Sequence, residues 1–326
     1  MKDWRFLIRE QRGTLIAMAL FVVMFTIYVT NHPAGFTLNV VTTASNKGVL
    51  LAFVAMAQTL VVVTAGIDLS LGMIFVLTNC LASWLVAGSP LETAFGVVAV
   101  LAAGLACGMV NGLIVIYGRL QPIVTTIATG AIYFGIALLL RPVPGGEVNQ
   151  DLADALTGKL FDRVPASLVA LLAVVLLIWI PFRRSLTGRA AYATGSSEAA
   201  AYMSGVPIRR ARFVAYSLAG LLAGIGGLFL TFFTYSGEAS AANGNTYTLY
   251  SIAAVVLGGV SLFGGVGSAI GAIFGAFVFR TIGDLLFVFD LEPLWQPLFQ
   301  GMVLLLAVCL GAFRLLQIRN RLDYFG

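Results

Sequence analysis

The side chains that most often carry out chemistry are scarce in this chain. His32 is the only histidine, so a metal site built on it would lack histidine partners. Cys80, Cys107 and Cys309 lie far apart within apolar segments, where we expect small buried hydrophobic residues. The sequence therefore predicts neither a disulfide nor a metal centre.

Nucleotide hydrolysis and proton coupling are also poorly supported. The only Gly-Lys pair, Gly158-Lys159, has Ala153 and Leu160 where a phosphate-binding loop needs a glycine and a hydroxyl residue. Asp68 is the one carboxylate near hydrophobic depth, whereas proton relays need several such groups. We expect no catalytic residue and no cofactor in this chain, so a transport function would take its energy from another subunit.

One short polar stretch, residues 194–207, contains residues typical of the start and the end of a two-turn helix. Gly195 is expected to break the chain, Ser196 to cap the helix, and Glu198 to favour the helix dipole from the first turn. Gly205 is placed to end the helix, and Pro207 prevents its continuation. Two turns are unstable alone in water, so this helix needs something to pack against.

This predicted helix, residues 196–204, lies inside an arginine-flanked segment, residues 183–212. Ala199, Tyr202 and Met203 share one face by helical spacing. Alanine permits close approach, and the two larger side chains supply contact area, a pattern that suits a groove on a partner protein. The alternative is a connector that lies on the lipid headgroups.

The elements that must position these residues are membrane spans. Of 326 residues, 60% are hydrophobic and 10% are charged, against about 25% charged in a soluble domain. Blocks of about twenty apolar residues match the thickness of a bilayer, and ten can be assigned, with nine spans or a broken helix as alternatives. The expected spans are residues 14–31, 48–66, 69–88, 93–117, 122–140, 164–182, 210–235, 247–262, 264–283 and 295–313.

The distribution of charge predicts the orientation of these spans. With ten spans, most lysines and arginines fall on the side of the N-terminus and most acidic residues fall on the other side. The positive-inside rule then places both termini in the cytoplasm. The net charge of +5 reflects this topology and requires no nucleic-acid partner. We expect a multi-pass protein of a bacterial inner membrane with an uncleaved first helix.

Four segments, in the right order, resemble the permease subunits of ABC importers, specifically those of ribose/galactose-type sugar importers. That family belongs with the branched-chain amino-acid permeases. The similar segments are Ala65–Gly72 (family pattern GGIDLSxG), Val110–Val115 with Leu120–Thr126 (NG-hydrophobic-LQPFIATL), Glu198–Val206, and Ile252–Gly259 with Gly264–Gly267. Position 65 is alanine where the family usually has glycine, and Gly195–Glu198 replaces a frequent GGNE. Four residues follow Glu198–Ala200 before Gly205, where the general pattern has three.

The resemblance implies an all-α polytopic membrane protein of about ten helices, a type II ABC-importer-like permease made of one domain, residues 1–326. A weak sequence similarity between residues 66–112 and 258–275 indicates two pseudo-related halves. The implied partners are a second permease subunit, a cytoplasmic ATPase that binds ATP and Mg²⁺, and a periplasmic binding protein that delivers a monosaccharide. The alternatives are a branched-chain amino-acid ABC permease and an ion-coupled secondary transporter.

Three groups of residues are assigned roles on these grounds. ATPase coupling is assigned to Glu198, Ala199, Ala200, Tyr202, Met203 and Gly205. The family motifs contain Gly66, Asp68, Ser70, Asn111, Gln121, Gly258 and Gly259. A sugar path is expected along Gln58, Asn79, Thr125, Thr129 and Tyr133. Sugars are bound by amides and hydroxyls, although a threonine in a membrane helix often bonds only its own backbone.

Asp68 and two glycine stripes are expected to shape the packing. Asp68 is predicted in the turn between the second and third spans, where it either caps a helix starting near Leu69 or contacts backbone donors or a neighbouring helix. Glycines spaced by four residues permit close helix packing. The stripes are Gly104, Gly108 and Gly112 in the fourth span and Gly267, Gly271 and Gly275 in the ninth.

Overall fold

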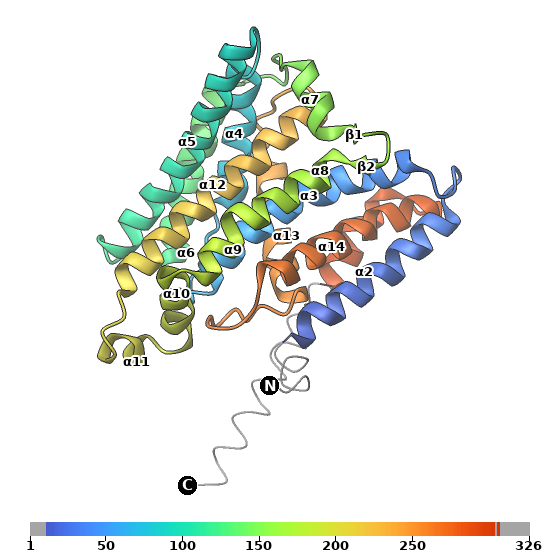
Figure 1. Ribbon diagram of the computed structural model, residues 1–326. Helices are drawn as coiled ribbons and strands as arrows, with labels where there is room; N and C mark the ends of the chain where they lie inside the picture. The colour runs from blue at the N-terminus through green and yellow to red at the C-terminus, as the bar shows by residue number, and fades with distance from the viewer. Residues whose placement is uncertain (1–10, 304, 307–326) are drawn as a thin grey trace.

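The computed structural model describes residues 11–303, 305 and 306, and these residues form a helix bundle with one small hairpin (Figure 1). The predicted all-α class is confirmed. The helices are α2 (Arg12–Asn31), α3 (Leu38–Val62), α4 (Leu71–Leu85), α5 (Pro90–Ile116), α6 (Pro122–Leu140), α7 (Gln150–Thr157), α8 (Ala166–Val174), the π-helix η1 (Val175–Trp179), α9 (Ile180–Arg184), α10 (Leu186–Ser196), α11 (Glu198–Met203), α12 (Ile208–Thr234), α13 (Ala241–Leu257), α14 (Ala269–Val288) and the 3₁₀-helix η2 (Pro293–Trp295). Strands β1 (Lys159–Leu160) and β2 (Val164–Pro165) pair antiparallel.

Seven helical segments within the described residues are long and apolar enough to cross a bilayer. They are α2, α3, α5, α6, α12, α14 and the continuous run Ala166–Arg184, which joins α8, η1 and α9. α4 is apolar but has only 15 residues, and α13 has 17. The last predicted span, 295–313, extends beyond the described residues, so the count of ten stays a prediction.

Two predicted spans were too short at the same end of the molecule. α3 begins at Leu38 and α14 ends at Val288, so both helices include polar residues that hydropathy had excluded. Among them are Lys47 and Asp284, which form an ion pair with 3.1 Å between Nζ and Oδ1. Asp284 thus lies within a helix long and apolar enough to cross a bilayer, and it joins Asp68 as a carboxylate to consider there.

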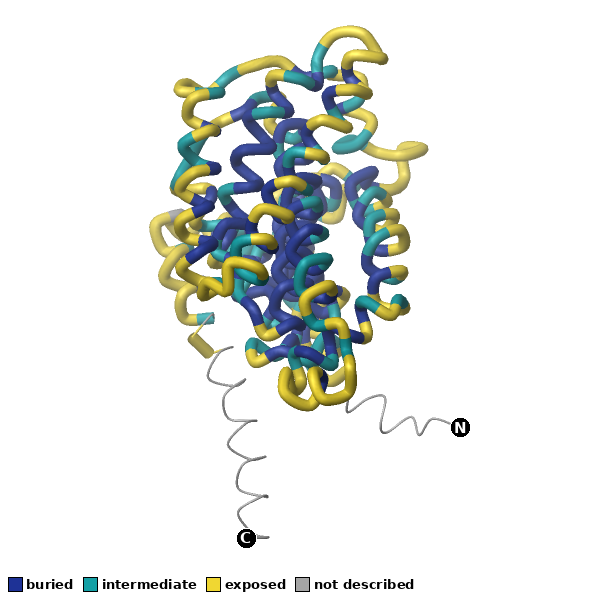
Figure 2. The backbone as a smooth tube through the Cα atoms, turned by 90° about the vertical axis from the view of Figure 1, so that its left-hand side faces the viewer, coloured by how far each residue is buried: buried dark blue, intermediate teal, exposed yellow. Residues whose placement is uncertain are grey.

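The core is built around α3, which is buried without interruption from Gly48 to its end. Figure 2 shows the buried backbone at the centre of the bundle. α12 packs beside α5, and their glycines permit the close approach (Figure 1). A Cβ at Gly108 would overlap the Tyr216 carbonyl oxygen, and one at Gly220 would overlap that of Gly104. The predicted packing role of this first stripe is confirmed.

The second stripe is only partly helical. Gly271 and Gly275 lie in α14, where an added Cβ would overlap the carbonyl oxygens of Gly258 and Ala254 at the end of α13. Gly267 precedes α14 and has a φ of +123°, so its assignment to the helix was wrong. It serves the turn that leads into α14.

The two ends of the bundle differ in charge. At one end lie α11 and the beginning of α2, and at the other lie α7 and the β1–β2 hairpin (Figure 1). We name these the α11 end and the α7 end. Arginines gather at the α11 end: Arg119, Arg183, Arg184, Arg189, Arg209, Arg210 and Arg212. Acids gather at the α7 end: Glu92, Glu147, Asp151, Asp154, Asp162, Glu238, Asp284, Asp290 and Glu292.

Candidate functional site

The short helix α11 begins later than the sequence predicted. Gly195 and Ser196 belong to the last turn of α10, and Ser197 is the N-cap, with its Oγ accepting a hydrogen bond from Ala200 N at 3.3 Å. The predictions that Gly195 breaks the chain and Ser196 caps α11 were wrong, because the Ser196 hydroxyl donates to the Tyr192 carbonyl within α10.

The C-terminus of α11 has the predicted geometry. Gly205 has a φ of +71°, its N–H donates to the Tyr202 carbonyl at 3.0 Å, and Val206 N–H donates to the Ala201 carbonyl at 3.0 Å. This pair of bonds is a Schellman motif, which satisfies carbonyls that a helix end leaves free. Pro207 follows directly, so α11 stops after six residues.

α11 presents the predicted face to the outside. Ala201 is buried against the bundle, whereas Tyr202 and Met203 are 78% and 81% exposed. Ala199 and Ala200 are exposed beside them. A large aromatic ring and a flexible thioether in open solvent are unusual, and they form a contact surface without a partner among the described residues.

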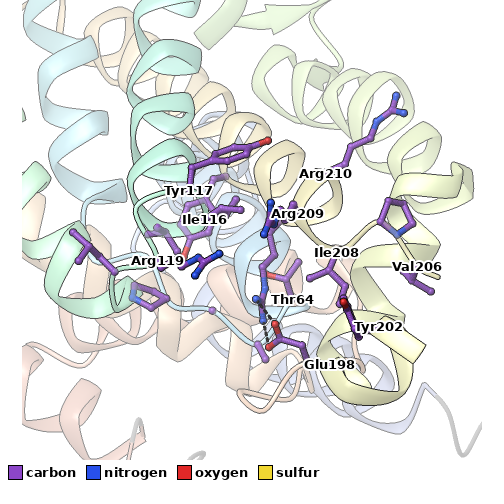
Figure 3. A pocket seen from close by; sticks show the side chains of 18 residues that line it. Thr64, Ile116, Tyr117, Arg119, Glu198, Tyr202, Val206, Ile208, Arg209 and Arg210 are labelled. Atoms are coloured by element: carbon purple, nitrogen blue, oxygen red, sulfur yellow. Dashed lines mark hydrogen bonds and ion pairs between the residues drawn. The ribbon is translucent and has the colours of Figure 1, made fainter. Parts of the chain in front are cut away.

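An ion pair fixes α11 to the long helix α12. Arg212 donates from its two terminal nitrogens to the two carboxylate oxygens of Glu198, at 2.9 and 2.7 Å (Figure 3). The planar, two-point geometry gives this pair directional rigidity that a single contact lacks. The pair therefore connects α11 directly to α12.

A pocket of about 890 Å³, the α11 groove, lies beside this ion pair (Figure 3). Its three walls come from the end of α3, the connection between α5 and α6, and the start of α12. The lining residues are Thr64, Ala65, Gly66, Val115, Ile116, Tyr117, Arg119, Leu120, Pro122, Glu198, Tyr202, Val206, Pro207, Ile208, Arg209, Arg210, Arg212 and Tyr216. The groove is basic, because four arginines face one glutamate along its walls.

Glycines join α10 to two motif segments. Gly195 lies against Val63, and a Cβ there would overlap the Val63 carbonyl oxygen. Gly265 N–H donates to that same carbonyl at 3.1 Å, and a Cβ at Gly265 would overlap the Ser196 hydroxyl. The base of α11 is thus packed backbone to backbone against the end of α3 and the loop before α14.

Tyr192 strengthens this junction from α10. Its hydroxyl donates to the Gly267 carbonyl at 2.6 Å, and the Arg183 guanidinium lies 3.9 Å from its ring centroid. Burial raises the pKa of Tyr192 to about 12, against the opposing effect of the Arg183 charge. The hydroxyl therefore stays a donor at physiological pH.

Asp68 is fully buried in the turn between α3 and α4. Its Oδ1 accepts from Ser70 N at 2.8 Å and Ser70 Oγ at 2.6 Å, and its Oδ2 accepts from Asn111 Nδ2 at 3.2 Å. The prediction that Asp68 caps a helix starting near Leu69 was wrong, because α4 begins at Leu71 and its N-cap position is Ser70. The alternative, contact with a backbone donor and a neighbouring helix, is confirmed.

The Asp68 network continues into α6. Tyr133 Oη lies 3.0 Å from Asn111 Oδ1 and 3.0 Å from the Cys107 carbonyl, both on α5. Leu69 N–H donates to Thr126 Oγ1 at 3.0 Å. The sequence did not single out Thr126, because its partner is 57 residues away. The network connects α4, α5 and α6 to the turn between α3 and α4, and this turn also lines the α11 groove.

The backbone conformation at position 65 suits glycine better than the alanine present here. The φ of Ala65, +62°, lies in the left-handed region, which is strained for a residue with a side chain. The neighbouring Gly66 lies under Tyr216, whose buried hydroxyl has no hydrogen-bond partner among the described residues. The turn is therefore held in a strained form by its surroundings.

The remaining motif residues have distinct places. Gly258 ends α13 against Gly271, and Gly259, with a φ of +78°, meets Gly13 at the start of α2. Gln121 is exposed at the start of α6 and makes no side-chain cap. The glycines thus hold close backbone contacts, whereas Gln121 does not join the Asp68 network.

The residues expected along a sugar path are buried among packed helices. Asn79 Nδ2 donates to Thr231 Oγ1 at 2.8 Å, and its Oδ1 accepts from Glu238 N at 2.9 Å. Thr125, Thr129 and Tyr133 are buried residues of α6, and Gln58 is a fully buried residue of α3. None of the five lines the α11 groove, and their place on a sugar path stays a prediction.

Comparison with known proteins identifies the class. Residues 39–308 match the family described as the permease component of branched-chain amino acid transport systems. The chain belongs to this family of permeases, and it is a multi-pass membrane protein. No solved structure matches it.

Three relatives illustrate the similarity. The chain is 31% identical to the ribose import permease protein RbsC of Escherichia coli K12, over 94% of each chain. It is 33% identical to the autoinducer 2 import system permease protein LsrC of Yersinia pseudotuberculosis, over 92% of this chain and 84% of the relative. It is 34% identical to the probable ABC transporter permease protein y4mJ of Sinorhizobium fredii, over 82% and 80%. The resemblance predicted from the motifs is confirmed.

Proposed function

We propose that this chain is the membrane-spanning subunit of an ATP-driven ABC importer that carries a monosaccharide into the cytoplasm. The observation that supports this proposal is α11: a short helix whose exposed face has no partner among the described residues and whose base is packed against the bundle. The names of the relatives support import of a ribose-like solute over import of an amino acid.

We further propose that the two ends of the bundle bind different partners. In a bacterial inner membrane the arginine-rich α11 end would face the cytoplasm, in accordance with the positive-inside rule, and both termini would lie on that side. An ATPase that binds ATP and Mg²⁺ docks there, with α11 seated in its cleft, and acidic side chains of the ATPase suit the basic α11 groove. A periplasmic binding protein docks at the α7 end, and a second permease subunit, identical or related, completes the pore.

Force would pass from the ATPase into the bundle by two routes. The Glu198–Arg212 pair connects α11 to α12, and the Gly195–Val63 contact connects α10 to the turn that Asp68 holds. The first route is a two-point ion pair and the second is close backbone packing, so a displacement of α11 tilts α12 and shifts the turn. Chemistry on the nucleotide belongs to the partner, and this chain contributes the moving part.

The test places a charge on the docking face. Ala199→Arg would bury an unpaired guanidinium in the interface with the ATPase, at a cost of several kcal/mol. We expect the variant to fold and insert but to lose ATPase co-purification and ATP-driven uptake of D-ribose in proteoliposomes that also contain the ATPase and binding protein. Leu186→Arg, on an exposed position of α10 away from this face, is the matched control and should retain both.

Normal uptake by Ala199→Arg would refute docking through α11. A parallel assay with L-leucine separates the sugar importer from the amino-acid alternative, since uptake of leucine alone would overturn the substrate class. Uptake by the permease without its ATPase, driven by an ion gradient, would overturn the importer itself.

A further inference from the structure

A second pocket, of about 420 Å³, lies at the α7 end among α2, α3 and α14, which run side by side in Figure 1. We name it the outer pocket. Its lining residues are Tyr28, His32, Asn39, Val40, Thr43, Lys47, Arg280, Gly283, Asp284, Phe287 and Gln296. Its volume falls at the lower end of the roughly 300–1,000 Å³ range of small-ligand sites.

Three charged side chains enter this pocket from within apolar helices. Lys47 projects from the third turn of α3 to Asp284, which is 8% exposed near the end of α14. Arg280 lies one turn earlier on α14, and its Nε is buried without a hydrogen-bond partner among the described residues. Charges within a membrane helix are costly and are usually retained for a function. The ion pair neutralises two of them, whereas Arg280 lines the pocket without an ion-pair partner among the described residues.

Amides and hydroxyls complete the polar lining. Asn39 and Thr43 lie exposed on the first turns of α3, on the same side as Lys47. Gln296 crosses over Gly283, where an added Cβ would lie 3.0 Å from its amide nitrogen. The pocket therefore contains planar donors and acceptors from a carboxylate, a guanidinium and two amides, a set that matches the paired hydroxyls of a polyol.

Aromatic rings form the remaining wall. The His32 ring lies 5.3 Å from the Tyr28 ring and 6.1 Å from the Phe287 ring, measured between centroids. Aromatic faces pack well against the apolar C–H face of a sugar ring, while polar groups in the same pocket bind its hydroxyls. The pocket therefore combines polar and aromatic side chains in a space of monosaccharide size.

We infer that the outer pocket is the site at which the permease first receives its solute, and that this solute is a neutral monosaccharide. The inference rests on the proposed function and names the site within it. A phospholipid headgroup is the alternative occupant, because Lys47 and Arg280 are cations that also suit a phosphate. A neutral sugar fits the lining better, because the Lys47–Asp284 pair leaves one charge unpaired among the described lining residues and the other polar groups are amides, hydroxyls and an imidazole. The location at the α7 end agrees with delivery by the periplasmic binding protein.

The experiment measures protection of a cysteine placed in the pocket. Thr43→Cys is made in a Cys309→Ala background, since Cys80 and Cys107 are buried. The complete importer, reconstituted in proteoliposomes, is treated from outside with a water-soluble maleimide in the presence of D-ribose, L-leucine or O-phosphoethanolamine. We expect D-ribose to slow labelling in a saturable way and the other two to have no effect.

Two variants and a control connect protection to the lining. Arg280→Gln and Asp284→Asn each remove a charge-assisted hydrogen bond, so the D-ribose concentration for half-protection should rise about tenfold or more. Glu238→Gln, an exposed acid at the α7 end outside the pocket, should leave it unchanged. In Arg280→Gln, the sugar carried per ATP hydrolysed should also fall, a ratio that a loss of folded protein would not change.

Three results would overturn the inference. The first is that D-ribose does not slow labelling while the same vesicles import it. The second is protection by O-phosphoethanolamine, which would assign the pocket to lipid headgroups. The third is an unchanged D-ribose concentration for half-protection in both variants. In the first and third cases ATP-driven D-ribose uptake continues, so the proposed function stands. Absence of D-ribose uptake in the unsubstituted importer would instead refute the proposed function.

Discussion

The Asp68 network makes a quantitative prediction about stability. Asp68→Ala removes the acceptor for Ser70 N, Ser70 Oγ and Asn111 Nδ2 while leaving these groups buried. Ser70 Oγ and Asn111 Nδ2 retain their 2.7 Å contact with each other, but Ser70 N has no substitute acceptor. Leaving buried donors without their acceptor costs about 1–3 kcal/mol. At roughly 2 °C per kcal/mol, we expect the melting temperature to fall by about 2–6 °C.

The assay is thermal unfolding of the purified importer in detergent, followed through permease tryptophan fluorescence. Asp68→Asn keeps one acceptor oxygen but turns an amide towards Asn111, so its loss should be about half as large. Glu238→Gln, an exposed acid, serves as the control and should melt like the unsubstituted protein. A double substitution, Asp68→Ala with Ser70→Ala, should cost less than the sum of the two single changes, because it removes both partners of the shortest bond.

One result would refute this reasoning. If Asp68→Ala melted at the unsubstituted temperature but abolished uptake, Asp68 would act on the solute or on gating, and its hydrogen bonds would not be structural. If it melted lower and the remaining folded protein still transported, the architectural role would be supported.

Three further predictions concern the α11 end. Ala65→Gly relieves the left-handed strain and should raise the free energy of unfolding by about 0.5–1 kcal/mol, so a lower melting temperature would contradict the assigned φ. Gly195→Ala introduces a methyl group against the Val63 carbonyl and should cost about 1–3 kcal/mol; uptake should fall more than ATP hydrolysis, and equal losses would argue against a coupling role. The raised pKa of Tyr192 means that unfolding favours its ionised form above about pH 10, so stability should fall by about 1.4 kcal/mol between about pH 9 and pH 11. Tyr192→Phe, compared by chemical denaturation at both pH values, should lack this part of the loss, and equal losses would show that the site is not buried.

Local chemistry explains which parts of the site could be predicted. The end of α11 depends on Gly205 and Pro207, whose backbone preferences act within a few residues, and both predictions are confirmed. The start depends on whether Ser196 or Ser197 caps, and adjacent serines have equal local preference. The contact of Gly195 with Val63, distant in sequence, extends α10 and selects Ser197.

The outer pocket was invisible to sequence reasoning for a related reason. Lys47 and Asp284 lower the hydropathy of their segments, so the predicted spans 48–66 and 264–283 excluded both residues. They are 237 residues apart, and only the folded chain brings them to ion-pair distance. Once paired, their charges are compatible with helices that continue past them, which is why α3 and α14 are longer than predicted.

By itself, the sequence determined that this protein is a bundle of apolar helices in a membrane, with a short polar helix outside it and the motifs of an importer permease. Composition and short-range backbone preference decide these features, because each depends on neighbouring residues. Only the tertiary structure decided that Asp68, Asn111 and Tyr133 form one network and that the outer pocket exists. Hydrogen bonds and ion pairs between distant helices depend on packing geometry, which no local pattern encodes.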